Sequence, residues 1–121
     1  MSAFQFQVVA ACRPWAQANK DAVVRFVRAL GDAFRFIRDG ANRAEVVAAI
    51  MASTGASEEI ARATLALYFE PDRSVVPRRG EIDLKGLAQV IAFMAEGGAI
   101  APPPAAERFV DLQYLRAAGV E

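Results

Sequence analysis

Few residues in this sequence are of the types that perform catalysis or bind metals. The chain of 121 residues has no His and a single Cys, Cys12. Without His, the catalytic triads and dyads that use it are excluded, and with one Cys so are disulfide pairs and His/Cys metal sites within this chain. Cys12 lies in an apolar run, where a lone thiol is more often a small buried group than a reactive one. We therefore expect Cys12 to be buried.

The closest carboxylate pairs and the adjacent arginines need not be catalytic or phosphate-binding groups. Glu58 and Glu59 fall where the first turn of a helix is expected, and the helix dipole favours acidic residues there. Glu81 and Asp83 come with no cleft that a sequence could reveal. The stretch RRGE at residues 78–81 could bind phosphate, but nearby acidic residues offset its charge, so a solvated loop is favoured. No set of acid, base and nucleophile can be assembled, and we expect no enzyme, cofactor or metal site.

Charge also argues against nucleic-acid binding. Basic and acidic residues number 14 each, whereas a nucleic-acid binder usually has a clear basic excess. Two expected helices around Gly55 could pass as a helix-turn-helix. The second of them begins Ser57-Glu58-Glu59 and has Arg62 as its one cation, so its start would repel phosphates.

The length of 121 residues predicts one domain. The periodicity predicts that it is mainly α, with a short strand followed by about five helices. Residues 4–11 alternate and then continue apolar, which is typical of a strand, and Pro14 would end it because proline cannot donate to a ladder. Helices are expected at about residues 19–39, 42–54, 57–70, 83–96 and 107–118.

Capping and terminating residues fix most of these helix ends. Asn42 and Glu45 have the spacing of a capping box, and Gly55 ends that helix. Ser57 should cap the next helix and Asp83 the one after the loop. The two glycines at residues 97–98 should end the helix that Asp83 caps.

The first long helix has more apolar surface than a single partner needs. Its main stripe repeats at steps of three and four residues, so its members share one face: Val23, Phe26, Val27, Leu30, Phe34 and Ile37. Val24 and Phe36 lie off this stripe. The phenylalanines at 26, 34, 36 and 93 are interpreted as core rather than as a cofactor site. The widened surface suggests contact with another domain or chain.

Several segments in a fixed order resemble the carboxy-terminal part of periplasmic substrate-binding proteins of ABC importers. The group concerned includes nitrate-, taurine- and alkanesulfonate-binding proteins and homologues that bind thiamine precursors. The likeness extends from about Val8 to Val120 and rests on order and spacing. The segments are WAQAN (15–19), VRFVRA (24–29), FIRD (36–39), NRAE (42–45), TG (54–55), GEIDLKGL (80–87), and PPP with VDLQYL (102–104 and 110–115).

The resemblance implies a fold of two α/β lobes joined by crossing strands, of which this chain would be the last third. It implies that the intact protein is periplasmic, captures a small-molecule solute between its lobes and delivers it to an ABC permease. The chain departs from that pattern in lacking the first lobe, most of the second, and a signal peptide at residues 1–7. Most ligand contacts of such proteins would lie outside it. Arg13 and Trp15 follow the expected strand and are the candidate ligand-binding residues; a surface Arg and a packing Trp are the alternative.

A second hypothesis remains open from the sequence. The chain could be a self-contained helical module or cytoplasmic regulator that binds a protein partner through the apolar face of its first long helix. Under the first hypothesis, by contrast, the chain is a fragment of a larger protein and would expose surface made for the interior of that protein. For such a fragment we also expect copies of the chain to associate through the exposed apolar surface.

Overall fold

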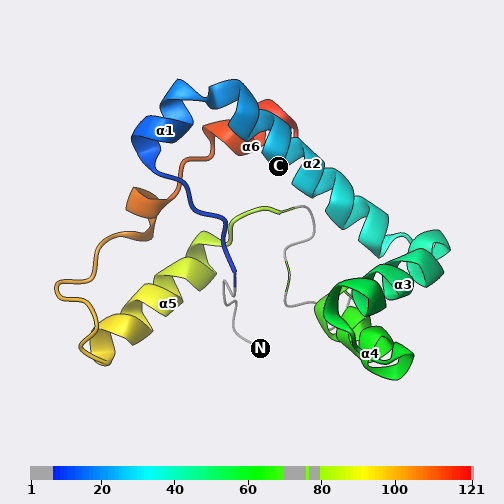
Figure 1. The fold of residues 1–121 in the computed structure, drawn as a ribbon. Helices are drawn as coiled ribbons and strands as arrows, with labels where there is room; N and C mark the ends of the chain where they lie inside the picture. The colour runs from blue at the N-terminus through cyan, green and yellow to red at the C-terminus, as the bar shows by residue number, and fades with distance from the viewer. Residues whose placement is uncertain (1–6, 70–75, 77–79, 121) are drawn as a thin grey trace. The chain divides into compact units, whose positions relative to one another are not determined.

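The computed structural model describes residues 7–69, 76 and 80–120, and this part of the chain is mainly helical (Figure 1). That confirms the mainly α class predicted from the sequence. The helices in chain order are α1 (Arg13–Ala18), α2 (Lys20–Arg38), the 3₁₀ turn η1 (Gly40–Asn42), α3 (Arg43–Thr54), α4 (Glu58–Phe69), α5 (Leu84–Glu96), the 3₁₀ turn η2 (Ala106–Phe109) and α6 (Gln113–Ala118).

The chain divides into two compact units, where its length had indicated one domain. The first unit combines Met1–Arg28 with Glu81–Glu121, and the second is Ala29–Gly80. Chain length is a weak guide because it does not reveal whether the helices share one core.

The second unit is built on a helical hairpin, α3 and α4, which pack side by side. Its core joins two residues of each helix: Val46, Val47, Ala61 and Leu65, each less than a tenth exposed. Gly55 ends α3 in the left-handed conformation at φ 72°, which glycine adopts without steric cost. The hydroxyl of Ser57 accepts a hydrogen bond from the Ile60 N–H at 3.4 Å, so the predicted cap of α4 is confirmed.

In the first unit, α5 packs against η2. Its predicted cap is present, since Asp83 Oδ1 accepts a hydrogen bond from the Lys85 N–H at 3.0 Å. The helix ends at Gly97, as expected. The buried apolar residues of the described part of this unit are mostly small and come from several elements: Ala16, Ile91, Ala106, Tyr114, Ala118 and Val120.

The amino-terminal strand predicted for residues 4–11 is absent where the structure describes the chain. Residues 7–11 have no regular secondary structure, and residues 4–6 lie outside the described residues. A strand needs a neighbour to pair with, and the described residues contain no other strand. Pro14 therefore does not end a strand among the described residues. It lies in the first turn of α1, where its fixed φ and missing N–H suit a helix start.

Two other helix starts differ from the prediction. Asn42 makes no side-chain cap to α3, and its amide donates instead to the Phe36 carbonyl at 3.1 Å. Asp39 caps the preceding turn η1 instead, since its carboxylate accepts a hydrogen bond from the Ala41 N–H at 2.9 Å. The expected helix at 107–118 is divided into η2 and α6.

None of the helices among the described residues is long and apolar enough to span a membrane.

Candidate functional site

The two candidate ligand-binding residues lie on α1 but do not converge. Arg13 Nη2 donates to the Arg108 carbonyl at 3.1 Å, and Nη1 lies 4.0 Å from a carboxylate oxygen of Asp111. Arg13 thus connects α1 to Arg108 and Asp111, while its side chain stays 58% exposed. Trp15 is 54% exposed. Residues two positions apart on a helix point to different sides, so these two side chains do not form one binding surface.

Cys12 is exposed, which corrects the expectation that it is buried. Its neighbours explain the difference. Residues 7–12 precede α1 without forming a strand, and no strand among the described residues covers this apolar run.

Three of the four phenylalanines expected in the core are also exposed. Phe26 is 53%, Phe36 41% and Phe93 73% exposed, whereas Phe34 is half-buried and its ring lies 6.2 Å from that of Phe69. Periodicity correctly places Phe26 and Phe34 on a helix, but the described part of the chain supplies no surface that covers Phe26, Phe36 or Phe93.

Of the acidic and basic residues considered for chemistry, Glu58 forms an ion pair, and two arginines lie outside the residues that the structure describes. Glu58 Oε1 accepts two hydrogen bonds from Arg62, at 2.9 and 2.6 Å, which is an ion pair along one face of α4. Residues 78 and 79 of the RRGE stretch lie outside the described residues. Within the described ranges, no group of three or more Cys, Asp and Glu is placed to hold a metal ion.

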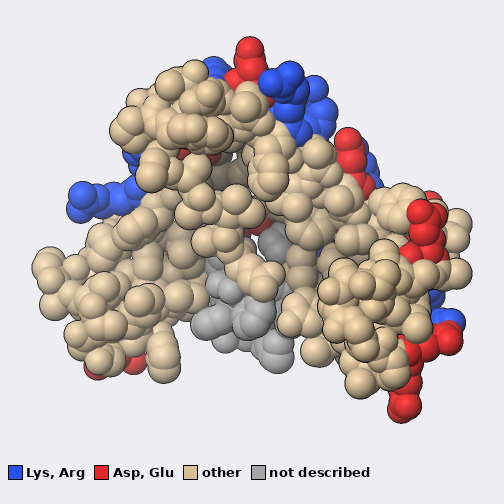
Figure 2. Space-filling model, viewed as in Figure 1, with Lys and Arg blue, Asp and Glu red and all other residues tan. Residues whose placement is uncertain are grey.

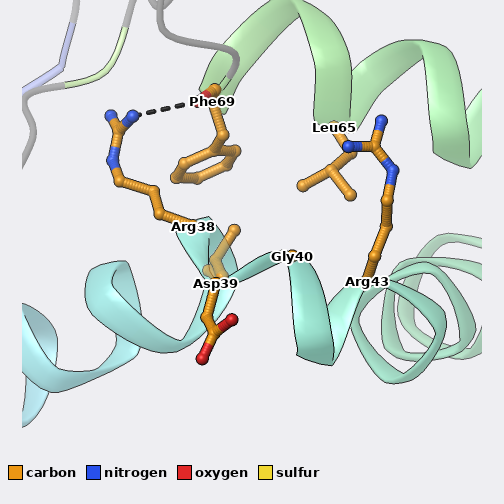
Figure 3. A pocket seen from close by; sticks show the side chains of 7 residues that line it. Arg38, Asp39, Gly40, Arg43, Leu65 and Phe69 are labelled. Carbon is orange, nitrogen blue, oxygen red and sulfur yellow. Dashed lines mark hydrogen bonds between the residues drawn. The ribbon is translucent and has the colours of Figure 1, made fainter.

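A small cavity lies in the second unit beside Arg38 (Figure 3). Its volume is about 80 Å³, and it is lined by Ile37, Arg38, Asp39, Gly40, Arg43, Leu65 and Phe69. This volume is well below the roughly 300–1,000 Å³ of typical pockets for small organic ligands.

Arg38 has a structural role at this cavity. Its guanidinium donates to the Phe69 carbonyl at 2.9 Å and to the Val76 carbonyl at 3.0 Å, and it lies 5.4 Å from the centre of the Phe69 ring. The last carbonyls of a helix have no partner within the helix, so Arg38 satisfies one at the end of α4. This role of Arg38 could not be read from the sequence. Its partners, 31 and 38 positions away, left no local signal.

Several large apolar side chains are exposed among the described residues. In the second unit, Ile60 and Leu67 are 58% and 53% exposed, and their spacing of seven places them on one face of α4. In the first unit, Phe93 and Met94 of α5 are exposed, as is Phe109 of η2. Figure 2 shows few charged side chains over the visible face of α5. Exposed apolar patches are found at protein, membrane and ligand contact sites.

Comparisons with models of protein families, with curated proteins and with solved structures found no match to this sequence.

Proposed function

We propose that this chain is the carboxy-terminal part of a solute-binding protein of an ABC importer. The intact protein would have two α/β lobes, bind a small solute between them in the periplasm and present it to a membrane permease. The chain would contribute helices that complete the second lobe, while most solute contacts would come from the rest of the protein. It would not be an enzyme.

The order of the motifs supports this proposal, because they fall on successive structural features. TG (54–55) ends α3, the acidic residues 58–59 begin α4, and GEIDLKGL (80–87) leads into α5. VDLQYL (110–115) leads into α6. The motifs quoted for the resemblance therefore fall at the starts and ends of helices.

The observation that carries the proposal is the exposure of large apolar side chains on five of the eight helical elements among the described residues: α1, α2, α4, α5 and η2. Phe26 on α2, Leu67 on α4 and Phe93 on α5 are each more than half exposed. Burial of one such side chain stabilises a protein by about 1.5–3 kcal/mol, so leaving many uncovered forgoes much of the available stabilisation. Missing lobes would supply the surface that covers them.

The coding sequence upstream of Met1 tests this proposal directly. We expect a continuous reading frame that encodes strands and helices of two lobes, preceded by a signal peptide. Purified from that longer frame, the protein should gain thermal stability from a solute of the nitrate, sulfonate or thiamine-precursor classes. A stop codon or a complete unrelated gene immediately before Met1 would contradict the proposal.

A self-contained helical interaction module is the second candidate. The closed core of α3 and α4 favours it, because Ala61 is fully buried and Val47 and Leu65 are nearly so without help from another chain. A module of this kind would bind a protein partner through its uncovered apolar side chains, with the hairpin as its stable support.

The purified chain of residues 1–121 distinguishes the two functions. A fragment should bind the dye ANS, associate as its concentration rises and unfold over a broad temperature range. A module should be a monomer or closed dimer at all concentrations tested, bind little dye and unfold in one sharp transition. Light scattering, dye fluorescence and a thermal melt on the same sample give this answer.

A further inference from the structure

We draw no further inference here: the strongest candidate, the apolar surface patch that Ile60 and Leu67 form on the exposed face of α4, carries nothing because nothing in the structure shows what covers it.

Discussion

Two leucines on α4 provide a matched test of the core and of the uncovered surface. Leu65 is 4% exposed and packs in the core with Val46, Val47 and Ala61, whereas Leu67 is 53% exposed on the same helix. The substitutions Leu65→Ala and Leu67→Ala remove the same atoms from the same element. A difference between them therefore reports burial and not chemistry.

The structure sets the size of the expected effect of Leu65→Ala. The substitution removes three carbon atoms, whose burial is worth about 0.8 kcal/mol each, or about 2.4 kcal/mol together. Leu65 also lines the cavity of about 80 Å³ together with the polar residues Arg38, Asp39 and Arg43. Water can therefore occupy part of the new space, and the further cost of an empty cavity should be small. We expect a loss of about 2–3 kcal/mol, near the lower end for buried leucines. A unit of about 50 residues has a total stability of only about 3–8 kcal/mol.

Leu67→Ala should change the free energy of unfolding by less than about 0.5 kcal/mol, because the side chain is more than half exposed and alanine is a slightly better helix former. Urea unfolding followed by far-ultraviolet circular dichroism measures both variants. Hydrogen exchange should locate the effect of Leu65→Ala in α3 and α4 and leave α5 unchanged. Equal losses for the two variants at low protein concentration would refute the assignment of core and surface on α4.

Four further predictions follow from single side chains. Arg38→Ala should destabilise the second unit by about 1.5–3 kcal/mol, because it removes charge-assisted hydrogen bonds; Arg35→Ala, which breaks only the exposed pair with Asp32, should have little effect in the same urea titration. Asp83→Ala should cost about 1 kcal/mol through the lost cap, seen as faster hydrogen exchange in the first turn of α5. The thiol of Cys12 should react completely with Ellman's reagent without denaturant; reaction only in urea would contradict its exposure. Phe26→Ser should lower dye binding of the chain while its melting temperature stays within a few degrees, and a large fall in melting temperature would show that Phe26 is covered.

Local rules predicted the helix ends well, because a cap is decided by a few neighbouring atoms. Gly55, Ser57 and Asp83 each satisfy backbone groups within four residues of themselves, and all three act as the sequence indicated. The same rules failed at Pro14, which ends strands and begins helices equally well. Whether residues before it form a strand depends on a partner strand, and sequence position does not supply one.

The candidate site was harder to predict because its geometry depends on distant contacts. The contact of Arg13 with the Arg108 carbonyl spans 95 positions, and those of Arg38 span 31 and 38. No periodicity records such pairs. Burial was equally difficult to predict, since an apolar stripe shows that a helix has a face to cover without showing what covers it.

The helix α2 shows this gap between pattern and burial most clearly. None of its six stripe residues is fully buried, and Phe26 is more than half exposed. In the first unit, Arg28 of this helix donates to the carbonyls of Ala117 and Ala118, at 3.4 and 3.5 Å. In the second unit, Ile37 packs against the hairpin core.

Among the described residues, these contacts leave part of the apolar stripe of α2 exposed. Both candidate functions require another surface that covers the stripe and differ in the origin of that surface. A surface within the same polypeptide would cover the stripe permanently, so stripe residues would contribute to folding of the longer protein. A separate partner would cover it reversibly, and the same residues would then determine affinity while the free chain kept its stability. The effect of stripe substitutions on stability or on binding therefore separates an incomplete lobe from a complete module.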